Sequence, residues 1–232
     1  LLYTSIAGFK LKEMLKNSEF KFYAAMIAGF TLFIMLELIF RCNYEVEHAF
    51  RSSAFQVVSF ITTTGLFSDD AAKWPHVTWV VLAACMFFGG SSGSTSGGIK
   101  SIRGVMLVKV IKNEFRQILH PNAVLPMKVD GYNVQMCKRL TLLAFIGLYL
   151  FLAVICAFTM IAAGIDSTNS MTITLSSLGN VGPTLGLEIG PTMSWNELPD
   201  FAKWISSFLM LVGRLELFSV LVLFTPSFWK EN

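Results

Sequence analysis

Long runs of apolar residues dominate the chain, and several are long enough to cross a membrane. Leu140–Ile165 contains no Asp, Glu, Lys or Arg, and the same is true of residues 74–99. Phe201–Phe224 is interrupted by only three charged residues. A spanning helix needs about 20 predominantly apolar residues. These runs therefore predict transmembrane helices rather than the buried core of a soluble enzyme.

Charged residues gather in the segments between these runs. Lys100–Arg139 holds eight Lys and Arg against two acidic residues, and the first 21 residues hold four Lys against two Glu. Residues 41–73 carry four acidic and three basic residues, and residues 166–203 carry four acidic residues and one basic residue. Cytoplasmic loops of membrane proteins are enriched in Lys and Arg. We therefore expect both basic segments to be cytoplasmic and both acidic segments to be external.

Each acidic segment also contains a shorter piece, about 16 residues long and rich in Ser and Thr. The two pieces are Ala49–Gly65 and Ser167–Gly182. They are short for a spanning helix, and if either crossed the membrane the two basic segments would lie on opposite sides. Both are predicted to be re-entrant half-helices that enter from outside and return as extended chain. Non-helical backbone at membrane depth is tolerated where protein covers it or where it lines water.

The two halves of the chain match in pattern at an offset of 117 residues, which places Gly65 on Gly182. The same offset aligns two pairs of outer helices, Tyr23–Phe40 with Leu140–Ala157 and Trp79–Val108 with Asn196–Thr225. Internal repeats of this kind are a common way to build a central pathway in channels and transporters. We therefore predict that each half consists of an outer helix, a re-entrant loop and a second outer helix.

Composition supports a polytopic membrane protein. The chain has 232 residues, of which 54% are hydrophobic and only 14% charged, with a mean hydropathy of +0.61. Soluble domains carry about 25% charged residues. The chain opens with Leu1 and shows no signal-peptide pattern, so it is expected to be a fragment. Its four cysteines are widely spaced, which indicates neither a disulfide framework nor a zinc site.

The tips of the two re-entrant pieces are the candidate ion-binding elements. They read "TTTG" (Thr62–Gly65) and "GNVGP" (Gly179–Pro183). An extended strand after a short helix can turn its carbonyl oxygens toward an axis, where they replace the water shell of an alkali cation. Neither tip contains an acidic residue, which argues against a carboxylate site for divalent cations. The alternative is a pair of simple turns between helices. The candidate filter residues are Thr63, Thr64, Gly65, Asn180, Val181 and Gly182.

Ten consecutive Gly, Ser and Thr residues, Gly89–Gly98, interrupt the second apolar run. We call this segment the Gly/Ser loop. Poor helix formers in such number cannot sustain a helix, and their exposed peptide groups are tolerated beside a water-filled cavity. A cytoplasmic linker is the simplest alternative. The glycines of the Gly/Ser loop are Gly89, Gly90, Gly93, Gly97 and Gly98.

A phosphate-binding loop is a second alternative for this segment. Gly93 and Gly98 have the required spacing, but Ile99 stands where the motif needs Lys, and Lys100 comes one place late. No distinct strand and turn precede the glycines, as the motif requires. This interpretation would make the protein an ATP-driven membrane enzyme using residues 89–100.

Arg214 lies near the middle of an apolar run, where a lone Arg costs at least about 2.5–3.5 kcal/mol. The 117-residue offset maps it onto Gly97, inside the Gly/Ser loop. There it could bond loop carbonyls or repel a cation. The alternative is a structural ion pair with Glu216, but residues two apart point to different faces of a helix.

Four motifs carry a resemblance to a known family: "ITTTGLF", "GGSSGSTSGGIK", "GNVGPTLG" and "GRLELF". At these spacings the chain resembles the TrkH/KtrB family of potassium transporters, and within it the TrkH branch. The resemblance implies an all-α membrane protein with four helix–pore loop–helix repeats in pseudo-fourfold arrangement. This chain would be its C-terminal half, the third and fourth repeats. It also implies that the Gly/Ser loop lies under the filter and, with Arg214, gates the pathway.

The expected organisation combines these observations. It consists of a cytoplasmic N-terminal segment 1–21, a first repeat 22–112 containing the gating loop 89–98, a cytoplasmic linker 113–137, a second repeat 138–226 and a cytoplasmic tail 227–232.

The expected function is potassium uptake through a multi-pass protein of the plasma membrane, the inner membrane of a bacterial cell. No enzyme activity, no bound cofactor and no nucleic acid are expected, and K⁺ is the transported ion. The resemblance implies a homodimer, an N-terminal half with two further repeats, and a cytoplasmic nucleotide-binding regulatory subunit docked on basic surfaces such as Lys109–Arg139. A Na⁺-permeable or K⁺/Na⁺-coupled symport member of the same family stays open as an alternative.

Overall fold

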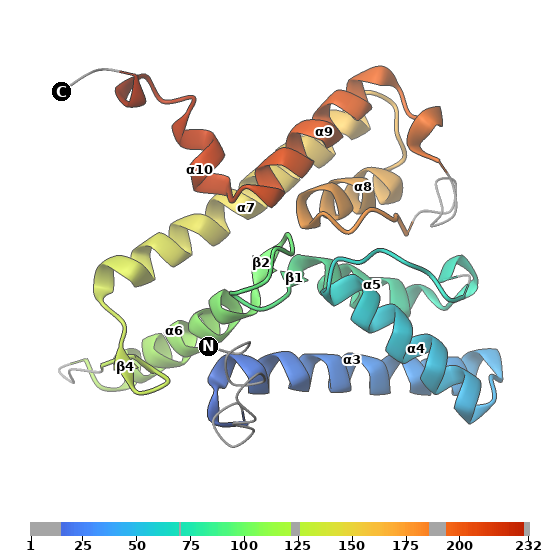
Figure 1. Cartoon of the computed structure of the whole chain (residues 1–232), viewed down its shortest axis with the longest axis horizontal. Coiled ribbons are helices and arrows are strands. Elements are labelled where there is room, and N and C mark those ends of the chain that lie inside the picture. The colour runs from blue at the N-terminus through green and yellow to red at the C-terminus, as the bar shows by residue number, and fades with distance from the viewer. Residues whose placement is uncertain (1–14, 70, 122–125, 186–193, 230–232) are drawn as a thin grey trace.

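The computed structural model describes residues 15–69, 71–121, 126–185 and 194–229, and it is mostly helical (Figure 1). The expected segment 1–21 therefore lies largely outside the described residues, as do the last three residues of the expected tail 227–232. The α-helices are α3 (Ser18–Cys42), α4 (Val46–Ile61), α5 (His76–Phe87), α6 (Ser101–Leu119), α7 (Met136–Ala162), α8 (Ser167–Gly179), α9 (Asp200–Arg214) and α10 (Leu217–Val222).

Short elements connect these helices. Single 3₁₀ turns cover Ala71–Lys73, Trp195–Glu197 and Pro226–Phe228. Four two-residue strands form two small pairs: β1 (Phe88–Gly89) with β2 (Ile99–Lys100) in parallel, and β3 (Lys128–Val129) with β4 (Tyr132–Asn133) in antiparallel orientation. The expected linker 113–137 thus holds the end of α6 and the β3–β4 hairpin.

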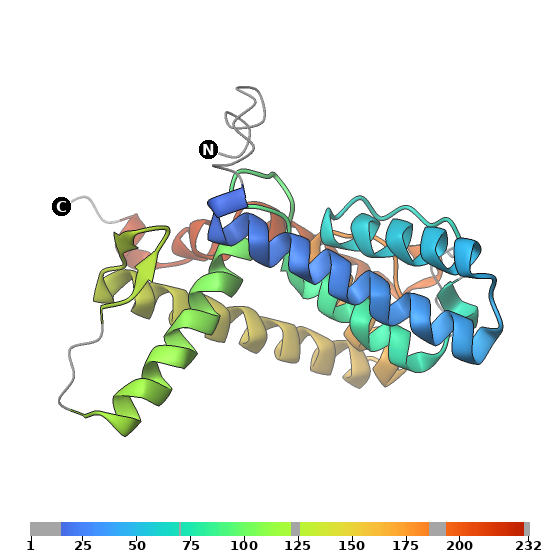
Figure 2. The same ribbon diagram turned by 90° about the horizontal axis from the view of Figure 1, so that it is seen from below.

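The helices form two groups, each with one inner helix packed on two outer ones. In Figure 1, α3, α4 and α5 lie on one side of the molecule, and α7, α8 and α9 lie on the other. The helix α4 packs on α3 and α5, and α8 packs on α7 and α9. Seen from below, the molecule is elongated, and α3 and α7 run along most of its length (Figure 2).

The first outer helix of each group is longer than the sequence indicated. The helix α3 starts five residues before the expected Tyr23, because the side chain of Asn17 accepts hydrogen bonds from the N–H groups of Glu19 (2.8 Å) and Phe20 (3.1 Å). This is an N-terminal cap, which satisfies N–H groups that have no partner within the helix. Among the described residues, α3 and α7 are the two helices long and apolar enough to span a membrane, and α5 is a shorter apolar helix.

The second outer helix is interrupted in both groups. The first interruption is the Gly/Ser loop, where α5 ends at Phe87 and α6 begins at Ser101. The second was not predicted: the expected helix Asn196–Thr225 is divided into α9 and α10 at residues 215–216. Glu216 there has a φ of +66° and ψ of 133°, a conformation that breaks a helix. The two interruptions fall at positions about 117 residues apart.

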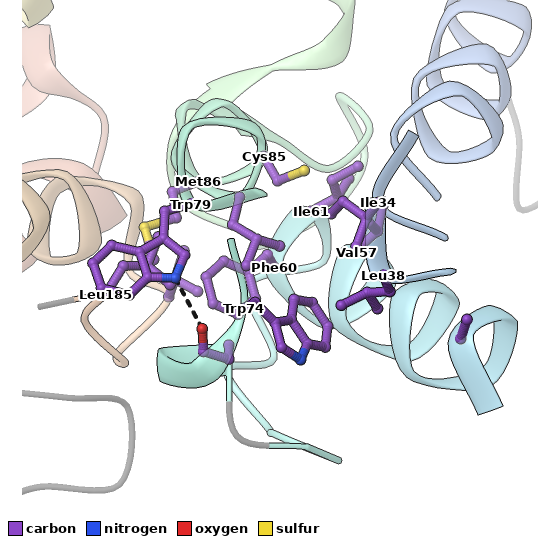
Figure 3. Close-up of a cluster of buried hydrophobic side chains, with 14 residues drawn as sticks. Ile34, Leu38, Val57, Phe60, Ile61, Trp74, Trp79, Cys85, Met86 and Leu185 are labelled. Carbon is purple, nitrogen blue, oxygen red and sulfur yellow. Dashed lines mark hydrogen bonds between the residues drawn. The ribbon is translucent and has the colours of Figure 1, made fainter. Parts of the chain in front are cut away.

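The largest buried cluster joins the two groups. Figure 3 shows side chains from α3, α4 and α5, including Ile34, Phe60 and Met86, packed together with Leu185 from the second half. The Trp79 indole N–H donates to the Ala71 carbonyl oxygen (2.9 Å), which fixes the short turn after the first tip. This packing holds the two tip regions next to each other.

Candidate functional site

The two tips have the same unusual backbone conformation at positions 117 residues apart. Thr63 and Asn180 both have positive φ angles, 55° and 54°, and so do Gly65 (73°) and Gly182 (105°). A positive φ is uncommon for residues other than glycine. Its recurrence at matched positions shows that both tips leave their short helix by the same turn.

A buried serine in α4 anchors the first tip. The Ser59 hydroxyl donates to the Leu66 carbonyl oxygen (2.7 Å) and accepts from the Leu66 N–H (2.8 Å). The Ser59 carbonyl oxygen accepts from the Thr64 N–H (2.8 Å). Since Ser59 is only 3% exposed, these bonds hold the segment that follows the turn against the buried side of α4.

Ser176 does the same for the second tip, and it lies 117 residues after Ser59. Its carbonyl oxygen accepts from the Val181 N–H (3.0 Å), and its hydroxyl accepts from the Gly182 N–H (3.1 Å). The Asn180 side chain adds a bond to the Met210 carbonyl oxygen of α9 (3.1 Å). The strand is therefore held both to its own short helix and to the neighbouring outer helix.

The two tips lie directly against each other. A Cβ atom added to Gly65 would lie 2.1 Å from the Val181 carbonyl oxygen and 3.0 Å from Cδ of Pro183. No side chain fits at that distance, so this contact requires glycine at position 65. The oxygen atoms that the tips offer to a ligand are backbone carbonyls and the side chains of Thr and Asn. In the part of the chain that the structure describes, no group of three or more His, Cys, Asp or Glu could hold a metal ion.

The Gly/Ser loop is a closed loop whose two ends are joined. Phe88 pairs with Ile99, and Gly89 pairs with Lys100, in the parallel β1–β2 contact. The Ser101 N–H donates to the Gly90 carbonyl oxygen (3.1 Å). The loop is therefore a defined structure between two helices.

The loop lies against the second tip. A Cβ atom on Gly97 would lie 2.4 Å from the Gly179 carbonyl oxygen and 2.9 Å from the Asn180 Cβ. Gly98 adopts a positive φ of 71°, and nothing lies within 4 Å of the Cβ position of Gly93. The side of the loop that contains Gly97 thus faces the filter candidates, while the part around Gly93 is open.

Arg214 is the last residue of α9 and lines a small cavity together with Ser96 and Gly98 of the loop. The structure places it beside the loop, as the sequence predicted, but it is exposed there. Among the described residues it makes no hydrogen bond and no ion pair. The predicted bonds between Arg214 and loop carbonyls are therefore not present in this conformation.

Sequence reasoning missed the acidic partner at this position. The Glu216 carboxylate lies 3.1 Å from the Arg103 guanidinium and 3.5 Å from the Lys100 ammonium. The Arg103 guanidinium also lies over the Phe145 ring, 4.0 Å from its centroid. A carboxylate within an apolar run needs such partners, and that need was the available signal. Lys100, one place late for a phosphate loop, is engaged here with Glu216.

A second missed residue is Glu19, in the first turn of α3. It is only 5% exposed, and both of its carboxylate oxygens accept hydrogen bonds from Ser92 of the Gly/Ser loop, one from the N–H and one from the hydroxyl (2.9 Å). Nothing in the local sequence could have indicated a contact between residues 73 positions apart.

The chain matches a known protein family over most of its length. The profile of the TrkH family, described as a cation transport protein, matches residues 18–231. The Trk system potassium uptake protein TrkH of Salmonella typhimurium is 35% identical over 232 residues, which is 100% of this chain and 47% of the relative. TrkH of Halomonas elongata is 33% identical over 222 residues, 96% of this chain and 45% of the relative. The chain thus spans about half the length of the curated relatives it matches.

A solved structure shows the same arrangement of elements. The crystal structure of the potassium transporter TrkH from Vibrio parahaemolyticus superposes with a TM-score of 0.87 at 33% identity, covering 94% of this chain and 46% of that one.

Proposed function

The chain belongs to the TrkH family of cation transport proteins, and on that premise we propose that it forms the C-terminal half of a potassium uptake protein. The two tips would supply half of a selectivity filter, and the Gly/Ser loop would gate the path beneath it. The relatives are named as potassium uptake proteins and are transporters rather than enzymes.

The observation that carries this proposal is the pair of matched tips. Both tips have the same turn, and each is held by a serine, Ser59 or Ser176, at positions 117 residues apart. The two tips meet at Gly65 and Val181. The Leu66 carbonyl oxygen accepts from Ser59, but Thr64, Val181 and Gly182 are held through their N–H groups. The carbonyl oxygens of the tips themselves would therefore be available to an ion. Carbonyl rings of this kind replace the hydration shell of K⁺. The complete ring would need two further tips from an N-terminal half.

The gating role rests on the position of the Gly/Ser loop. Gly97 contacts the second tip at Gly179 and Asn180, so the loop lies at the end of the proposed filter. Arg214 lines the cavity next to it, and a positive charge beside a cation path is a barrier to K⁺. We therefore keep Gly89, Gly90, Gly93, Gly97, Gly98 and Arg214 as the proposed gate.

The remaining parts of the proposal concern location and partners. We place the protein in the plasma membrane, the inner membrane of a bacterial cell, with α3 and α7 as spanning helices. The basic segment Lys109–Arg139 would face the cytoplasm, because basic loops remain there. It would offer a docking surface to a nucleotide-binding regulatory subunit. The functional unit would be a homodimer of complete chains.

Substituting Gly182 in the complete protein tests the filter. Nothing lies within 4 Å of its Cβ position, but its φ of 105° is one that residues with a side chain rarely adopt. Gly182→Ser therefore strains the turn and places a side chain beside the proposed carbonyl ring. We expect K⁺ over Na⁺ selectivity, measured by flux into liposomes, to fall while the folded yield falls no further than in a control variant with the same backbone strain.

The matched control is Gly164→Ser, at an exposed position after α7 that also has a positive φ (92°) and nothing within 4 Å of its Cβ position. This variant should keep the selectivity of the parent protein. Equal K⁺ and Na⁺ discrimination in Gly182→Ser and in the parent would remove the filter assignment.

A further inference from the structure

We propose that the β3–β4 hairpin is mechanically coupled to the Gly/Ser loop through the first turn of α3, so that a partner bound to the hairpin can shift the gate. The coupling residues are Asp130, Ser18, Glu19 and Ser92. This inference rests on the proposed function, because it assigns a means of regulation to the proposed gate.

The loop end of this coupling is the contact of Glu19 with Ser92. Both carboxylate oxygens are used, and the donors are the backbone N–H and the hydroxyl of the same residue. Hydrogen bonds to a charged acceptor are stronger than bonds between neutral groups. A buried carboxylate that lost these donors would be left without compensation. Glu19 therefore holds the part of the loop around Ser92 to α3.

The hairpin end is the contact of Asp130 with Ser18. The Asp130 carboxylate accepts from the Ser18 N–H (2.9 Å), the first N–H of α3. Asp130 and Gly131 have φ angles of 48° and 87°, as in the tight two-residue turn that joins antiparallel strands. This turn sets the position of the carboxylate, and a negative charge is favoured at the start of a helix.

The turn of α3 between the two contacts is held by an N-terminal cap and an aromatic contact. Ser18 and Glu19 are consecutive, and the Asn17 side chain caps the N–H groups of Glu19 and the following residue. The Phe22 ring meets the Phe88 ring, at the start of the loop, edge to face, with centroids 6.2 Å apart. A displacement of this turn by the hairpin must therefore move the contact with the loop.

The hairpin is accessible to a partner. Asp130 is exposed, and Tyr132 on the second strand is 80% exposed. The hairpin lies within the basic segment Lys100–Arg139, and the Lys109 ammonium donates to the Lys128 carbonyl oxygen (2.9 Å). A protein that binds there needs an acidic patch and an aromatic contact for Tyr132.

A cysteine at position 96 reports directly on the loop. Ser96 is only 8% exposed, and Ser96→Cys, which replaces one oxygen atom by sulfur, can be introduced into the complete protein after Cys42 and Cys137, the two cysteines that are not buried in this half, are replaced by Ser. Any accessible cysteines outside this half are replaced as well. The rate of reaction with a thiol reagent then measures how often the loop moves away from the second tip and from α3.

Asp130→Gly removes the oxygen that accepts from the Ser18 N–H and keeps the positive φ of the turn, whereas Asn would keep an acceptor oxygen at this position. We expect Glu19→Ala to raise this rate about tenfold, which corresponds to about 1.4 kcal/mol, and Asp130→Gly to raise it about threefold. Combining the two should give no more than Glu19→Ala alone, because both changes break one coupling. Glu114→Gln, an exposed carboxylate of α6 that makes no bond within the described residues, is the control and should keep the parent rate. If Glu19→Ala does not fold, Ser92→Ala removes only the hydroxyl bond and should raise the rate to a smaller extent.

A parent-like rate in Asp130→Gly together with a raised rate in Glu19→Ala would overturn the coupling to the hairpin. A parent-like rate in both Glu19→Ala and Ser92→Ala would overturn the contact with the loop. K⁺ flux of the same variants separates this inference from the proposed function. Raised reactivity without raised K⁺ flux would support the coupling and remove the loop as the gate.

Discussion

The anchoring of the first tip by Ser59 can be tested by removing a single hydroxyl group. Ser59→Ala abolishes both bonds to Leu66 but leaves the bond from the Thr64 N–H to the backbone of residue 59 in place. The change therefore loosens the strand after the turn without removing the turn itself. We expect the K⁺/Na⁺ permeability ratio of the complete protein to fall, because a loosened strand no longer holds its carbonyls at one spacing.

The size of the effect follows from the number of bonds. A neutral hydrogen bond contributes about 0.5–1.5 kcal/mol net, and an unsatisfied buried group costs more. Since Leu66 is 60% exposed, water replaces part of the lost bonding, and we expect a total of about 1–2 kcal/mol. If all of this free energy is lost from the discrimination between K⁺ and Na⁺, the permeability ratio falls by about fivefold to thirtyfold. Ser176→Ala removes one bond to the second tip, so its effect should be about half as large in free energy.

Ser53→Ala is the matched control in the same helix. Ser53 is also fully buried, but its hydroxyl donates to the Phe50 carbonyl oxygen within α4 (3.1 Å) and not to a tip. Because Ser53→Ala removes one bond instead of two, its thermal stability should fall by about half as much as that of Ser59→Ala, with no change in selectivity. Ion selectivity follows from reversal potentials, and stability from thermal unfolding of the purified protein. Parent-like selectivity in Ser59→Ala, or an equal loss of selectivity in Ser53→Ala, would show that the Ser59 hydroxyl does not set the position of the tip.

Three further predictions concern the tip contact, the gate and the topology. Gly65→Ala should abolish selective K⁺ flux, because its Cβ would lie 2.1 Å from a carbonyl oxygen of the second tip and its φ is positive; selective flux in liposomes at the parent level would contradict this. Arg214→Ala and a shortened Gly/Ser loop should each raise K⁺ flux per molecule, less than additively in combination; lower or equal flux after shortening the loop would exclude the gate. Lys16 and Lys128 should react with impermeant reagents only from the cytoplasmic side. Labelling of these two lysines from opposite sides would mean that the first re-entrant segment crosses the membrane.

The helical elements were predictable where local chemistry determines them. The charge-free run from Leu140 predicted α7, and consecutive Gly and Ser residues predicted the interruption between α5 and α6, because such residues favour no helix. The Asn17 cap and the Asp130–Gly131 turn are also local signals. They add the first turn of α3 and the β3–β4 hairpin, which the long apolar runs did not indicate.

Contacts between distant segments could not be predicted in the same way. Neither Gly nor Pro stands at residues 215–216, where the helix breaks. The Glu216 carboxylate pairs there with Lys100 of β2 and Arg103 of α6, which lie far away in the sequence. Position along the sequence located Arg214 beside the loop, yet its charge alone could not specify a bonding partner. The burial of Glu19 likewise depends on the loop that packs over it. In each case tertiary packing decides what the side chain does.

The parallel contact of Phe88–Gly89 with Ile99–Lys100 has a consequence for how the loop can vary among related proteins. Because the ends of the loop are already joined, its length does not determine the separation of α5 and α6. The entropy of closing a flexible loop grows only with the logarithm of its length, so doubling the number of residues costs about 0.6 kcal/mol. Insertions at the open side near Gly93 would therefore leave the flanking helices in place while changing the frequency of loop opening by about threefold. Loop length would then act as a fine adjustment of opening rate that mutation can alter without disturbing the filter.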